Sequence, residues 1–122
     1  MRIFILFIIS FLFLQNSYGQ NLKIELFNKT GYDLDSVSIG DKYVGLIKSG
    51  HSSLVLDCKE IIMQDGLPYG LPDGTIKKKK RNTELLGLCG TGRTAVSNGN
   101  FKFNITVTEN EFGYRLFWDY HK

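Results

Sequence analysis

Residues 101–120 read FKFNITVTENEFGYRLFWDY, two runs in which large apolar side chains alternate with polar ones. Alternation with a period of two is typical of a β-strand that buries one face. If Asn110 and Glu111 lie at the centre of a turn, every large apolar residue of one run pairs with another across a hairpin. The predicted pairs are Val107 with Tyr114, Ile105 with Leu116, Phe103 with Trp118, and Phe101 with Tyr120.

The aromatic side chains of this hairpin fit two interpretations, a core face or an exposed stacking platform for sugars. They alternate with aliphatic residues on the same face, and an exposed apolar patch of that size is rare in a soluble monomer. The sequence therefore predicts that these aromatic residues face the core: Phe101, Phe103, Tyr114, Trp118 and Tyr120.

Three or four further strands are predicted nearer the start of the chain. Residues 22–27 alternate, and the polar residues 28–31 then interrupt the pattern. Residues 35–39 and 42–47 flank a Gly-Asp dipeptide, which suits a two-residue hairpin turn because glycine accepts a positive φ. Residues 53–57 follow a second break. In the predicted hairpin Val37 faces Val44, Ile39 faces Lys42, and Leu46 shares the face of Val37.

This spacing of strands and breaks predicts the fold class. We expect an all-β protein: a small antiparallel β-sandwich of Ig-like or Greek-key type, or a small barrel, with about seven strands. Residues 65–74 contain both prolines and two Asp-Gly turns, which argues against a strand or helix there. A single domain is expected over residues 20–122, a common size for one compact unit.

The first nineteen residues have the layout of a secretory signal peptide. Arg2 precedes an apolar run at residues 3–14, and small residues at 17 and 19 mark a cleavage site. A membrane anchor is the other interpretation, but about twelve apolar residues are fewer than the roughly twenty that a spanning helix needs. We expect cleavage after Gly19, contact with the membrane only during export, and a periplasmic or secreted location in a bacterium.

Charge along the chain is patterned. The leader contains one of the 15 basic residues and none of the 12 acidic ones, so the remainder has a net charge of only +2. A nucleic-acid-binding domain would carry a general excess of positive charge. We therefore expect no nucleic-acid partner.

Two cysteines, Cys58 and Cys89, follow the leader. In an oxidising compartment an even pair favours a disulfide, although two unrelated buried thiols are the other interpretation. A bridge across this loop would stabilise the fold by about 3 to 4 kcal/mol in the chain-entropy account. It would also tie both ends of the irregular middle segment to the β scaffold.

The middle segment contains the strongest candidate for a binding surface. Five consecutive basic residues create a local positive potential that attracts acidic groups. The simpler interpretation is a solvated loop or a protected strand edge. Long ordered loops in compact domains are often functional, and Tyr69 adds an apolar contact. The predicted binding residues are Tyr69, Lys77, Lys78, Lys79, Lys80 and Arg81.

Signals for catalysis or metal binding are weak. His51, Asp57 and the serines at 49 and 52 can be arranged on paper as a triad, but triads are defined by geometry and not by closeness in sequence. His51, His121 and the two cysteines lack the close pairs from which zinc sites are built. We predict no catalytic residues, no metal and no cofactor.

These features together predict a non-enzymatic module that binds another protein, as an inhibitor, an immunity factor or an envelope accessory protein. The basic segment is its expected contact surface. The alternatives are a small secreted hydrolase that uses His51, or a binder of anionic envelope polymers or glycans.

Overall fold

The computed structural model describes residues 21–82 and 92–122, which form ten strands and no helix. The predicted signal peptide lies outside these residues. Within the described part of the chain, no helix is long and apolar enough to span a membrane. The strands are β1 (Leu22–Asn28), β2 (Leu34–Ile39), β3 (Lys42–Ile47), β4 (Leu56–Cys58), β5 (Ile61–Gln64), β6 (Leu67–Pro68), β7 (Asp73–Ile76), β8 (Arg93–Val96), β9 (Gly99–Asn110) and β10 (Gly113–Tyr120).

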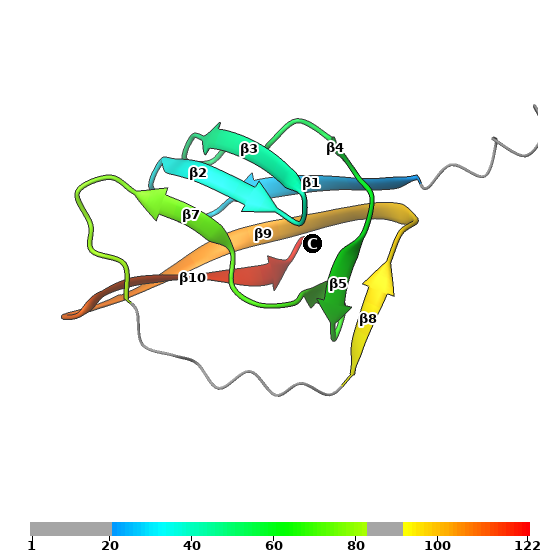
Figure 1. The fold of residues 1–122 in the computed structure, drawn as a ribbon. Helices are drawn as coiled ribbons and strands as arrows, with labels where there is room; N and C mark the ends of the chain where they lie inside the picture. Colours follow the sequence, from blue (N-terminus) through cyan, green and yellow to red (C-terminus); the bar gives the residue numbers. More distant parts are fainter. Residues whose placement is uncertain (1–20, 83–91) are drawn as a thin grey trace, which may run out of the picture.

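These strands form three small sheets, with the orders β10-β9-β1-β4, β3-β2-β7 and β6-β5-β8 (Figure 1). The prediction of an all-β fold is confirmed. All strand pairs within the sheets are antiparallel except one, because β1 runs parallel to β9, with Ile24 opposite Phe101 and Leu26 opposite Phe103. A parallel pair needs a long connection, and here that connection contains the strands of the other two sheets.

One cluster of buried side chains draws on all three sheets. Aliphatic residues predominate in it, and the aromatic members come from the hairpin of β9 and β10. Its buried members are Leu22, Ile24, Leu26, Leu34, Val37, Ile39, Ile47, Cys58, Ile61, Met63, Ile76, Phe103, Ile105, Tyr114 and Leu116.

The hairpin of β9 and β10 has the predicted faces but a different register. The predicted pairing of Val107 with Tyr114 is wrong by two residues, because Val107 lies opposite Leu116. The Asn110 side chain accepts a hydrogen bond from the Phe112 backbone at 2.9 Å, so the turn is centred one residue later than expected. Side chains alternate with a period of two, so this slip keeps each residue on its predicted face. The other observed pairs include Ile105 with Trp118 and Phe103 with Tyr120.

On the predicted core face, the side chains become less buried toward the end of β10. Phe103 and Tyr114 are buried, whereas Phe101 and Trp118 are only partly buried. Tyr120 is 51% exposed, so its prediction as a core residue is wrong. Its hydroxyl donates a hydrogen bond to the backbone oxygen of Asp65, which holds the ring across the turn between β5 and β6.

A bulge changes the first hairpin differently, because it alters which side chains face the core. Ile39 pairs with Lys42 as predicted, but a register shift places Val37 opposite Gly45 instead of Val44. Beyond the bulge the alternation is reversed, so Ile47 is buried and Leu46 is 53% exposed. The predicted place of Leu46 beside Val37 is therefore wrong.

The middle of the chain contains more regular structure than its glycines and prolines suggested. β6 and the first half of β7 lie within residues 65–74, where we expected no strand. These strands are two and four residues long, and each is held by a partner elsewhere in the chain. Short strands of this kind lack a periodic pattern that sequence could reveal.

Asn28, at the end of β1, is a fully buried polar residue. Its side-chain nitrogen donates to the backbone oxygens of Tyr32 at 2.7 Å and Ile47 at 2.8 Å. Its side-chain oxygen accepts from the Thr30 hydroxyl at 2.6 Å and the Thr30 backbone nitrogen at 3.1 Å. The amide therefore uses both of its donors and both acceptor positions to join β1, the following turn and the end of β3.

We predict that Asn28→Ala lowers the free energy of unfolding by about 2 to 4 kcal/mol, because it leaves buried backbone groups without partners. Urea unfolding followed by circular dichroism measures this change. Asn100→Ala is the matched control, since Asn100 is exposed on β9, and it should change stability by less than about 0.5 kcal/mol. Equal stability of the two variants would contradict the structural role of Asn28.

Candidate functional site

The five predicted basic residues, Lys77 to Arg81, form an ordered segment that we call the basic turn. It follows β7 directly and begins with a tight reversal, in which the Lys79 backbone nitrogen donates to the Ile76 oxygen at 3.3 Å and Lys78 has a φ of 65°. At its far end the Tyr114 nitrogen donates to the Lys80 oxygen at 3.0 Å, and the Asn82 nitrogen donates to the Tyr114 oxygen at 2.8 Å. The basic turn is therefore attached to the first residues of β10 (Figure 1).

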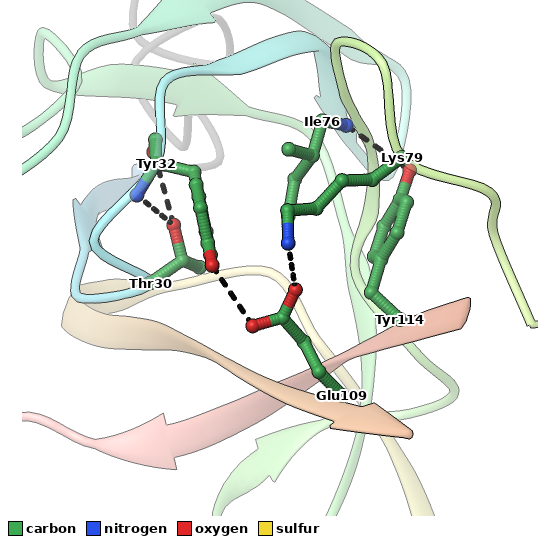
Figure 2. A network of polar contacts seen from close by, with 6 residues as sticks. All are labelled: Thr30, Tyr32, Ile76, Lys79, Glu109 and Tyr114. Atoms are coloured by element: carbon green, nitrogen blue, oxygen red, sulfur yellow. Dashed lines mark hydrogen bonds and ion pairs between the residues drawn. The ribbon is translucent and has the colours of Figure 1, made fainter. Parts of the chain in front are cut away.

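Gly113 makes this attachment sterically feasible. A Cβ atom at this position would collide with the Lys80 backbone oxygen, and φ is 133°, a region that L side chains rarely adopt. Only glycine accepts both the conformation and the close approach. Beside it, the buried Tyr114 hydroxyl accepts a hydrogen bond from the Ile76 backbone nitrogen at 3.0 Å, which joins β7 to β10 (Figure 2).

Figure 2 shows the side-chain contacts that hold the middle of the basic turn. The Lys79 ammonium donates to one carboxylate oxygen of Glu109, and the Tyr32 hydroxyl donates to the other at 2.9 Å. The same ammonium lies 4.6 Å from the centre of the Tyr32 ring, within the range of a cation–π contact. Hydrogen bonding to Lys79 first, and then to Tyr32, lowers the pKa of the Glu109 carboxyl. The hydrogen bond to Glu109 is the main cause that raises the pKa of Lys79.

Two of the five basic side chains thus pair with other residues of the protein at its surface. Besides Lys79, Arg81 donates to the Pro72 backbone oxygen at 3.3 Å and lies 4.0 Å from an Asp73 carboxylate oxygen. The side chains of Lys77, Lys78 and Lys80 are exposed. We call these three residues the free lysines, because within the described part of the chain they have no ion-pair partner.

We predict that Gly113→Ala detaches the basic turn from β10. The added Cβ forces the Lys80 carbonyl away and removes the hydrogen bond from Tyr114, so the amide protons of Tyr114 and Asn82 should exchange with solvent at least tenfold faster. Hydrogen exchange followed by NMR measures this.

Gly70→Ala is the control for this substitution. Gly70 also has a positive φ, 87°, but a Cβ there would meet open space. It should cost about 1 to 2 kcal/mol from backbone strain alone without changing exchange at Tyr114. Equal exchange at Tyr114 in the two variants would show that the close contact has no effect.

The contact between Lys79 and Glu109 gives the basic turn a pH-dependent attachment. The lowered pKa of Glu109 stabilises the folded chain above the ordinary carboxyl pKa, and this contribution is lost as pH falls through the folded-state value. The raised pKa of Lys79 stabilises it below the ordinary lysine pKa, and this contribution is lost as pH rises through the folded-state value. The attachment should therefore be complete near neutral pH and weaken in acid.

We predict that the NMR shift of the Lys79 ammonium follows the titration of the Glu109 carboxyl, with a midpoint below that of an ordinary glutamate. In Glu109→Gln this acid transition should disappear, and in the control Glu111→Gln, which changes an exposed neighbour, it should remain. An unchanged transition in Glu109→Gln would contradict the pairing. Both groups are exposed, so added salt should reduce the effect.

Tyr69 was predicted as part of the same surface, but the structure places it elsewhere. Its backbone nitrogen donates to the Ile62 oxygen at 2.8 Å, which fixes it beside β5. In Figure 1 β5 and the basic turn lie at opposite ends of the molecule. Tyr69 instead lines a cleft of about 290 Å³, which we call the aromatic cleft, formed by Ser38, Ile39, Gly40, Glu60, Ile61, Ile62, Pro68, Tyr69, Leu71, Asp73 and Trp118.

Only one of the two cysteines of the predicted disulfide lies among the described residues. Cys58 is buried at the end of β4 and has no disulfide partner among the described residues, and burial is the main cause that raises the pKa of its thiol. Cys89 lies outside the described residues, so its pairing with Cys58 stays a prediction.

The residues considered for catalysis or metal binding make other contacts. The His51 ring donates a hydrogen bond from Nδ1 to the Ser49 backbone oxygen at 2.9 Å, and Asp57 pairs with Lys23 at 3.0 Å. His121 is partly buried, with its ring stacked 3.9 Å from that of Phe27. Among the described residues no group of three or more acidic, histidine or cysteine side chains could hold a metal ion.

Comparison with protein-family models, with curated proteins and with solved structures finds no match to this chain. Function therefore has to be argued from the sites themselves. The sequence did not indicate that Tyr32 and Glu109 contact the basic turn, or that Trp118 lines the aromatic cleft. Each reaches its site from a distant segment, so no local pattern marks it.

Proposed function

We propose that this chain is an exported, non-enzymatic β-domain that binds another protein through the three free lysines of the basic turn. One observation supports this most strongly: the backbone of the turn is fixed at both ends, while Lys77, Lys78 and Lys80 point their charges into solvent. A surface that is already ordered loses less conformational entropy on binding. Charges that attract a partner over a distance also speed association.

The chemistry of the free lysines favours an acidic partner surface. Lysine ammonium groups are compact, strongly hydrated point charges with three donors each. They suit scattered carboxylates on a protein surface, and the acidic residues Glu109 and Asp73 lie against Lys79 and Arg81 instead. An inhibitor, an immunity factor or an envelope accessory protein would use such a surface.

The proposal includes three features that rest on sequence. They are removal of residues 1–19 on export, the disulfide between Cys58 and Cys89, and an architecture of the β-sandwich or small-barrel type. The parallel pairing of β1 with β9 makes it a mixed variant.

We predict that replacing Lys77, Lys78 and Lys80 together with serine weakens binding of the partner, recovered by pull-down, by at least tenfold, because three positive charges leave the interface. The control replaces Lys48, Lys59 and Lys102, which are also exposed, and so makes the same change in net charge. Isothermal titration calorimetry at two salt concentrations measures both variants. Unchanged affinity in the first variant, or equal losses in both, would refute the proposal.

Anionic envelope polymers are the main competing ligand for the same charges. Polymer binding would fall steeply with salt and would not distinguish well between the two triple variants, because a flexible chain contacts many lysines. A protein partner should distinguish them.

A further inference from the structure

The aromatic cleft lies where the three sheets meet. β2 and β7 contribute Ser38 and Asp73, the segment at the start of β5 contributes Glu60, and β10 contributes Trp118. Tyr69, which directly follows β6, also belongs to the lining. Each of the three sheets therefore supplies part of the lining.

The charged side chains that line this cleft are all acidic. It has two carboxylates, Glu60 and Asp73, and no lysine or arginine belongs to the lining formed by the described residues. Asp73 accepts a hydrogen bond from the Ser38 hydroxyl at 3.4 Å. Its negative charge is partly balanced by Arg81, which lies 4.0 Å away and does not line the cleft. Glu60 is exposed. A positively charged group is the charge-complementary occupant.

The aromatic lining points to the same chemistry. The faces of tryptophan and tyrosine rings attract cations, and organic cations are often held by such rings together with carboxylates. Within this protein the Arg93 guanidinium already lies 4.8 Å from the centre of the Tyr69 ring. Trp118 is partly buried and packs edge-on against Phe103, at 6.1 Å between ring centres, which fixes the wall of the cleft.

We propose that the aromatic cleft binds one lysine or arginine side chain presented by another polypeptide. Its volume of about 290 Å³ lies at the lower end of the range for ligand pockets, which suits a single long side chain. The apolar stem contacts Ile62 and Leu71 while the charged end meets Glu60 and Asp73. The cleft meets the basic turn only at the contact of 4.0 Å between Asp73 and Arg81, and it does not depend on the function proposed for the basic turn.

The test uses Trp118, which is the only tryptophan of the chain, as its reporter. The full chain is titrated at constant ionic strength with Nα-acetyl-arginine amide and with Nα-acetyl-lysine amide, while tryptophan fluorescence is recorded. Saturable binding with a millimolar dissociation constant is expected for at least one of them. Nα-acetyl-norleucine amide, which lacks the charge, should bind at least tenfold more weakly.

Two variants and one control assign the binding to the cleft. Glu60→Gln and Asp73→Asn should each weaken binding at least threefold. Asp41→Asn removes an exposed charge that is not part of the lining, and it should change affinity by less than twofold. Equal affinities in all three variants would overturn the proposal.

An NMR titration gives an independent readout if Trp118 fluorescence does not respond. Amide shifts should change at Ser38, Gly40 and Ile62, which line the cleft, and not at Lys80. Absence of shifts at the cleft, or tighter binding of the neutral probe or of methyl glucoside than of the cationic probes, would refute a site for basic side chains.

Discussion

The buried side-chain amide of Asn28 is the constraint on which the rest of this structure depends. It lies at the end of the central strand β1 and forms hydrogen bonds that order the turn that follows. It also donates to the backbone oxygen of Ile47, the last residue of β3. Backbone groups buried at such a junction must find partners inside the protein, since water cannot reach them. A single residue supplies these partners, so the sheet of β1 and the sheet of β2 and β3 are joined at a fixed geometry.

The consequences of this junction extend to the basic turn. The carbonyl of Tyr32 accepts from Asn28, which orients Tyr32 so that its hydroxyl reaches Glu109 on β9. Glu109 in turn holds Lys79, while Gly113 and Tyr114 hold the end of the turn. Hydrogen bonds that begin in the buried core thus help to fix the backbone of the exposed basic turn. The three free lysines are attached to this fixed backbone.

Simple alternation was enough to predict the long strands and, apart from Leu46 and Tyr120, the faces that they bury, because the side-chain period of a strand depends only on local geometry. It could not predict register. At 101–120 the Asn110 side chain moved the turn, and at β2 and β3 a bulge at Val37 reversed the pattern and exposed Leu46. The basic run was visible in the sequence, whereas its partner Glu109 was not, because long-range contacts between charged residues leave no local signal.

Hydrogen exchange of the Asn28 side-chain amide tests the central claim most directly. Both of its protons are hydrogen-bonded and fully buried, so NMR should show them exchanging as slowly as the backbone amides of β1. The side-chain amide of Asn100, which is exposed, provides the fast reference in the same sample. Exchange of the Asn28 protons at the rate of Asn100 would contradict the account.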